Sequence, residues 1–114
     1  MNHDIIFHAV SKRKWPEYNK QGSFNPTGLP DKEAVIMCSS SEHLKEYLND
    51  GFKGRKNLLL LVIDRFRVNN KITKGDQSGE LLVHGAINID AILDKIRIDC
   101  NTDGYFDIEL KTDS

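Results

Sequence analysis

The chain has 114 residues, enough for one domain that buries its own core, so we expect a single domain over residues 1–114. Its 16 Lys and Arg nearly balance its 17 Asp and Glu, which argues against duplex nucleic acid as the main partner. No apolar run approaches the ~20 residues of a membrane helix, and the N-terminus lacks a signal-peptide pattern. The only two cysteines, Cys38 and Cys100, are therefore expected to be reduced and structural in a cytoplasmic protein.

The first apolar segment, residues 5–10, is continuous except for one histidine, His8. A continuous apolar run predicts a strand that is covered on both faces. We therefore expect His8 on a central strand, largely buried, with its ring facing a cleft shared with Ser39. An unpaired buried polar group costs about 1–3 kcal/mol, so this histidine either binds a backbone carbonyl as a structural residue or belongs to a site.

The remaining segments predict a mixed domain of two short helices followed mostly by strands. In chain order the expected elements are a helix over 12–21 that Ser11 caps and Gly22 ends, an irregular loop over 23–33, a strand over 34–38, a helix over 42–49 that a serine caps, a basic loop over 51–56, a strongly buried strand over 58–63, a short edge strand over 68–72, a loop over 74–79, an apolar segment over 81–84, a short turn over 89–93, a strand over 95–98 and an apolar piece over 105–110. This order indicates an α+β fold.

Candidate catalytic groups lie on or beside the apolar segments. The histidines His8 and His84 can act as acid–base groups or ligands, because imidazole titrates near neutral pH. Glu80 follows a glycine-containing loop, where a carboxylate can contact a ribose hydroxyl, act as a base or simply be solvated. Ser39 and Ser40, at the expected start of the second helix, either bind an anion there or cap the helix.

The cysteines offer a nucleophile or a metal ligand in principle. Cys38 can attack with a histidine partner, although a cysteine that ends an apolar strand is more often a small core residue. A zinc site from His8, Cys38, His84 and Cys100 would lack a close ligand pair such as C-x-x-C. We therefore expect no metal.

The loop after the second helix carries Lys53, Arg55 and Lys56, and Arg65 and Arg67 follow the next strand. This basic set is either a solvated rim or a receiver of phosphate, whose geometry matches the arginine fork. The common glycine-rich nucleotide signatures and the G-x-S-x-G hydrolase signature are absent from the sequence.

The order of the segments resembles a known family. The segments that carry the resemblance are Ile6-Phe7-His8, the Trp-containing stretch over 11–18, Cys38-Ser39, Gly51-Phe52-Lys53-Gly54, residues 59–64, Gly79-Glu80-Leu81 and His84-Gly85. Over about residues 5–98 they resemble the bacterial domain-of-unknown-function family 952. The resemblance implies an ADP-ribosyltransferase-like fold, with a split, mostly antiparallel sheet and two short helices.

The resemblance also implies a cleft, bordered by the first two strands, that holds a nicotinamide dinucleotide in active members of the fold. His8 matches the strand-one histidine that contacts the dinucleotide, while Glu80 and His84 match the Gly-Glu-Leu segment and the histidine after it. The chain departs from the family at Met37, where histidine is usual before Cys-Ser, and at Val83, where proline is usual. The expected Ile-Tyr-Gly after His84 is also shortened to Gly85.

Two functions follow from these observations. The first is an enzyme or former enzyme of the ADP-ribosyl- or phospho-transferase type, with NAD or an ADP-ribose- or phosphate-containing molecule as ligand. In that case the ligand-binding residues are His8, Ser39, Ser40 and Arg55, and the catalytic residues are Glu80 and His84. The second is a non-catalytic ligand-binding or protein-interaction module that keeps only the scaffold. Met37, in place of an imidazole, favours binding without efficient turnover.

Overall fold

The computed structural model describes residues 4–77 and 79–107. The elements are β1 (Ile5–Ser11), α1 (Trp15–Gln21), β2 (Ser23–Phe24), a 3-10 turn (Asp31–Glu33), β3 (Ile36–Ser39), α2 (Leu44–Gly51), β4 (Leu58–Asp64), a second 3-10 turn (Arg65–Arg67), β5 (Ile72–Lys74), β6 (Glu80–Val83), β7 (Ile87–Asn88), a third 3-10 turn (Ile89–Ala91) and β8 (Ile92–Ile98). They form a single α+β domain, as predicted. In the described part of the chain, no helix has the length and apolar character needed to cross a membrane.

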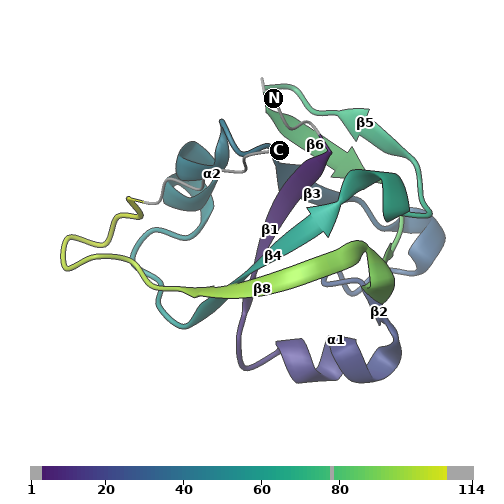
Figure 1. Cartoon of the computed structure of the whole chain (residues 1–114), viewed down its shortest axis with the longest axis horizontal. Coiled ribbons are helices and arrows are strands. Elements are labelled where there is room, and N and C mark those ends of the chain that lie inside the picture. Colours follow the sequence, from purple (N-terminus) through teal and green to yellow (C-terminus); the bar gives the residue numbers. More distant parts are fainter. Residues whose placement is uncertain (1–3, 78, 108–114) are drawn as a thin grey trace.

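Six strands form one antiparallel sheet in the order β5-β6-β3-β1-β4-β8, and β2 pairs with β7 in a separate two-stranded ribbon. Figure 1 shows the two helices far apart, α1 below the strands and α2 to their left. Successive side chains of a strand point to opposite faces. Accordingly Ile6 and Val10 of β1 pack with Trp15 of α1, whereas Phe7 packs with Leu48 of α2. The prediction that β1 is covered on both faces is confirmed.

The most buried strand is β4, as its leucine run predicts. Leu58, Leu60, Leu61 and Ile63 are fully buried. Every residue of β1 pairs with a residue of β4, from Ile5 opposite Asp64 to Ser11 opposite Leu58. This continuous ladder forms the centre of the sheet.

The first helix begins later than the sequence predicts. Residues 12–14 form a turn in which the Lys14 N–H donates to the Ser11 carbonyl at 3.1 Å, so α1 starts only at Trp15 and Ser11 does not cap it. The predicted end is correct, because Gly22 adopts a left-handed φ of 82° that non-glycine residues seldom take.

The second helix also begins beyond its expected start, at Leu44, and no side chain caps it. The serines instead shape the preceding turn, where the Ser40 Oγ accepts the His43 N–H at 3.4 Å. The predicted serine cap is therefore wrong.

Smaller differences affect the short strands. The edge strand lies at Ile72–Lys74 rather than over 68–72, and the two-residue β7 was not predicted. Residues 105–107 are not in a strand, and residues 108–110 of that expected segment lie outside the described part of the chain. Cys38 and Cys100 are both buried and unpaired, and they belong to the clusters on opposite faces of the sheet.

The sheet opens between β1 and β3. Only one pair, Phe7 opposite Ser39, joins the two strands in register, although β3 continues to Ile36. Beyond this pair the β1–β4–β8 part and the β3–β6–β5 part separate. The candidate site lies at this opening.

Candidate functional site

A pocket of about 410 Å³ lies where β1 and β3 separate, and we call it the His8 pocket. Its walls are formed by His8, Met37, His43, Tyr47, Asp50, Gly51, Phe52 and Glu80. They come from β1, β3, the turn before α2, α2 itself, the loop after α2 and β6. The volume is within the range of about 300–1,000 Å³ that is common for small-molecule sites.

The ring of His8 binds a β3 carbonyl that has no partner on β1 in the sheet. Its Nδ1 is 2.8 Å from the carbonyl oxygen of Met37, so this nitrogen carries a proton and donates it. In the neutral ring Nε2 is then an acceptor. Among the described residues, hydrogen-bond partners of this ring are found only at Nδ1. Nε2 of His8 is thus left as an acceptor. The predicted central strand is confirmed, and His8 lines the pocket.

Tyr47 of α2 binds the β1 backbone where hydrogen bonds between β1 and β3 are missing. Its hydroxyl oxygen accepts the backbone N–H of Ala9 at 3.1 Å and lies 3.2 Å from Nδ1 of His8. The β1 amide that faces the gap therefore finds a side-chain partner instead of a β3 carbonyl. Because a buried amide without a partner is costly, Tyr47 stabilises the open form of the sheet.

Burial sets the charge of this wall. Desolvation lowers the pKa of His8 below its ordinary 6.5, and the hydrogen bond to the Met37 carbonyl offsets only part of that effect. Desolvation also raises the pKa of Tyr47. Both groups are consequently neutral at pH 7, one imidazole and one phenol.

The other polar walls supply negative charge. Asp50 near the end of α2 and Glu80 at the start of β6 both line the pocket, and no lysine or arginine is among its described lining residues. One carboxylate oxygen of Glu80 accepts the Gln77 N–H at 3.1 Å, which ties the side chain to its own loop. Glu80 also lines a second pocket of about 390 Å³, which contains Arg65 and Lys74.

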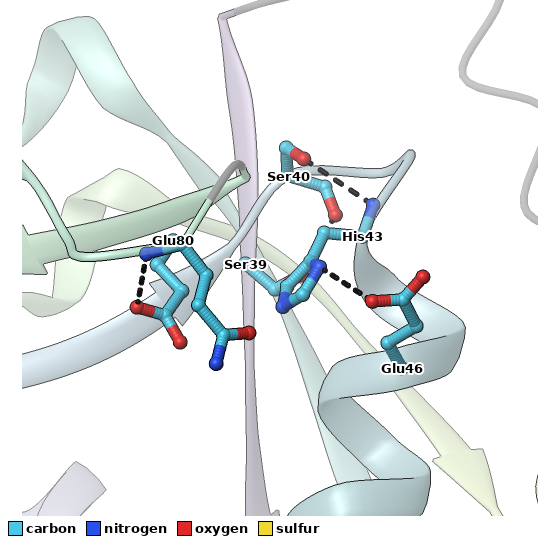
Figure 2. A network of polar contacts seen from close by, with 6 residues as sticks. Ser39, Ser40, His43, Glu46 and Glu80 are labelled. Atoms are coloured by element: carbon cyan, nitrogen blue, oxygen red, sulfur yellow. Dashed lines mark hydrogen bonds and ion pairs between the residues drawn. The ribbon is translucent and has the colours of Figure 1, made fainter.

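The turn between β3 and α2 forms one end of the site. Figure 2 shows Ser40 and His43 on this turn, Glu46 farther along α2, and Glu80 on the neighbouring strand. Nδ1 of His43 lies 3.4 Å from a carboxylate oxygen of Glu46. Gly79 closes the turn, since its carbonyl accepts the Ser40 N–H at 2.9 Å, and a Cβ there would lie 2.3 Å from the Cβ of His43.

The two serines proposed from the sequence lie away from the His8 pocket. Ser39 is fully buried, and its hydroxyl donates to the Ser40 carbonyl at 2.8 Å. Ser39 does not line the cleft with His8, contrary to our expectation, because its side chain turns back onto its own backbone. Ser40 lines the second pocket instead.

Arg55 and His84 also stand outside the pocket lining. Arg55 is exposed, with its guanidinium carbon 5.7 Å from the ring centroid of Phe52, which does line the pocket. His84 is exposed beyond the end of β6 and bonds to the hydroxyl of Thr73 at 2.7 Å. Of the six site residues named from sequence, the His8 pocket brings together His8 and Glu80.

Cys38 does not provide a reactive thiolate. Burial raises the pKa of Cys38 to about 12, so its thiol stays protonated at neutral pH. Within residues 4–77 and 79–107, no group of three or more histidine, cysteine or acidic side chains is arranged to hold a metal ion.

The sequence reasoning missed most of the α2 contribution. Tyr47 and the Asp50–Gly51 pair recur at helical spacing on one side of α2, in line with His43 just before its first residue. That stripe of polar and aromatic residues beside the buried Leu44 was the available signal. The contribution of the Met37 carbonyl could not be predicted from the sequence, because every residue type has a backbone carbonyl.

Comparisons with known proteins agree on the fold. The crystal structure of protein CC0527 from Caulobacter crescentus superimposes with a TM-score of 0.73 at 18% identity, over 89% of this chain and 91% of that one. The solution structure of CC0527 gives a TM-score of 0.67 at 18% identity, over 90% of both chains. No significant match was found among curated proteins. The family described as "Protein of unknown function (DUF952)" matches residues 9–95, and the chain belongs to this family.

Proposed function

We propose that the chain binds the nicotinamide end of an NAD-type molecule in the His8 pocket. The observation that carries the proposal is the neutral imidazole of His8, whose Nδ1 is engaged by the Met37 carbonyl and whose Nε2 is left as an acceptor. A carboxamide N–H is a suitable donor for this acceptor.

The charge of the pocket supports the same ligand. A ribosylated nicotinamide ring is a pyridinium cation, and the described lining offers two carboxylates, from Asp50 and Glu80, without a basic side chain. The C-terminal end of α2, at Asp50 and Gly51, adds partial negative charge. Tyr47 and Phe52 both line the pocket, with ring centroids 5.6 Å apart, and aromatic rings attract cations.

The family resemblance supports an ADP-ribosyltransferase-like assignment. In active members of that fold the dinucleotide cleft is bordered by the first two strands, and the His8 pocket lies between β1 and β3, the two strands that the sequence places first. Glu80 is then the group that faces the ribose hydroxyls. Its carboxylate is a good acceptor for them.

We place binding ahead of efficient turnover. Met37 lines the pocket where the resemblance would put a histidine, and the Cys38 thiol is protonated and buried. His84, the second catalytic candidate from the sequence, is not at the pocket. The two free, buried cysteines suit a reducing compartment, and we propose the cytoplasm.

The test is a calorimetric titration with nicotinamide riboside, with nicotinic acid riboside, and with NAD and ADP-ribose. We expect the riboside with a neutral carboxamide to bind more tightly than its carboxylate counterpart, because the pocket is acidic. Losing one neutral hydrogen bond in His8→Ala should weaken binding about three- to tenfold. His84→Ala is the matched control and should leave the affinity unchanged.

Amide chemical shifts of the unmodified protein provide a second readout if His8→Ala unfolds. We expect the largest ligand-induced shifts at Met37, Tyr47 and Phe52. The absence of binding by all four compounds at millimolar concentration would contradict the proposal and favour the protein-interaction module. Shifts confined to β5 and His84 would place the ligand elsewhere.

A further inference from the structure

We infer that the loop after α2 is a phosphate-binding rim of the His8 pocket, formed by Lys53, Arg55 and Lys56. The preferred occupant is then a nucleotide, with its ring in the pocket and its phosphate on this rim, rather than a nucleoside. The inference rests on the proposed function, because it assigns a second contact to the same ligand.

The loop adjoins the pocket directly. Phe52 forms part of the pocket wall, and the guanidinium carbon of Arg55 lies 5.7 Å from the centroid of that ring. A ligand that rests against Phe52 therefore has its outward end close to an arginine fork. Such forks match the oxygens of a phosphate and form charge-assisted hydrogen bonds with them.

The backbone holds the rim in place before any ligand arrives. The Gly54 N–H donates to the Gly104 carbonyl at 2.7 Å, and the Cys100 N–H donates to the Arg55 carbonyl at 3.1 Å. One residue past the rim, the Asn57 N–H is bound by the Asp99 carboxylate at 2.6 Å. Three contacts to the 99–104 segment thus fix the loop, which limits the ordering cost of binding.

The charge of the rim complements that of the pocket. All three cationic side chains are exposed, and no described carboxylate forms an ion pair with them. The Lys53 ammonium lies 2.9 Å from the Tyr105 hydroxyl, and this contact lowers the pKa of that phenol. The pocket itself holds two carboxylates, so a phosphate is disfavoured inside it and favoured at its edge.

The experiment compares nicotinamide riboside with nicotinamide mononucleotide, which differ by one phosphate. We expect the mononucleotide to bind the parent protein about tenfold more tightly than the riboside, which is the scale of one charge-assisted contact. Raising the salt concentration should reduce this preference, because the rim is exposed. Arg55→Ala should abolish most of the preference for the mononucleotide, while the affinity for the riboside stays within about twofold of the parent value.

Two control variants separate the outcomes. Arg13→Ala, an exposed arginine on the turn before α1, should keep the full preference. Riboside binding without a gain from the phosphate would overturn the rim and leave the proposed function standing. Failure of both compounds to bind would overturn the proposed function itself. A phosphate gain that survives Arg55→Ala and disappears in Arg65→Ala would assign the phosphate to the second pocket, and so would also overturn the rim.

Discussion

The two edges of β1 are built differently. Toward β4 the strand is paired along its whole length, from Ile5 to Ser11, and most of its partner residues are buried. Toward β3 only the pair of Phe7 and Ser39 is in register. Beyond it, the Met37 carbonyl is bound by the His8 ring, and the Ala9 N–H is bound by the Tyr47 hydroxyl. A ladder contact can be made by any residue, whereas a side-chain contact needs a particular one. The stable edge therefore supports the fold, and the open edge provides the pocket.

The largest effect should come from the paired edge. Leu60 is fully buried on β4, opposite Ala9, so Leu60→Ala leaves a cavity and should lower the free energy of unfolding by about 2–5 kcal/mol. Leu93→Ala on β8, where the side chain is 49% exposed, should change it by no more than about 0.5 kcal/mol. Urea unfolding monitored by circular dichroism measures both. Equal losses for the two variants would contradict the contrast in burial.

A smaller loss is expected at the open edge. Tyr47→Phe removes the acceptor of the Ala9 N–H and should cost about 1–3 kcal/mol, with faster hydrogen exchange at that amide. Tyr105→Phe is the matched control, because that phenol is exposed and should contribute little. If the hydrogen-exchange rate of the Ala9 amide stays at the parent value, the Tyr47 hydroxyl is not the acceptor of that amide.

The pH dependence of stability should reveal the partly buried imidazole of His8. Desolvation keeps the pKa of His8 below 6.5 in the folded protein, so below about pH 6.5 the unfolded chain binds a proton that the folded chain does not. The contribution of His8 is therefore complete above pH 6.5 and falls as the pH drops through and below that value. His8→Gln keeps an N–H donor for the Met37 carbonyl but has no titrating group. The difference in free energy of unfolding between this variant and the parent should therefore become smaller as the pH is lowered. A difference that is constant from pH 8 to pH 5 would contradict this.

The smallest effect should appear at the exposed rim. The hydrogen bond from Lys53, together with its charge, lowers the pKa of Tyr105, so Lys53→Met should raise that pKa toward 10.0. Ultraviolet titration of tyrosinate absorbance gives the change relative to the parent. The buried Tyr47, whose pKa is raised by desolvation, should ionise later in both proteins. An unchanged titration curve in the variant would contradict the contact between Lys53 and Tyr105.

The sequence predicted β1 and β4 well, because both are long apolar runs whose burial needs no information from distant residues. It misplaced the starts of both helices, because a turn precedes each of them. The Lys14 N–H donates to the Ser11 carbonyl in the first turn, and the His43 N–H donates to the Ser40 hydroxyl in the second. His8 was predicted to face a cleft because an imidazole stands out in an apolar strand, and it lines the pocket between β1 and β3. Ser39 was misplaced, since the direction of its hydroxyl depends on the local backbone turn.

The sequence by itself determined the class of the protein: a single α+β domain, a central strand that bears one histidine, a strongly buried neighbouring strand, and membership of the family through the order of its segments. The tertiary structure alone decided what surrounds that histidine. The pocket depends on where β3 leaves β1, on the turn that carries His43 and the side of α2 that carries Tyr47, and on the pairing that brings Glu80 of β6 alongside. These groups are separated by tens of residues in the chain. Only the pairing and packing of distant segments brings them together, and no local sequence pattern encodes that distance.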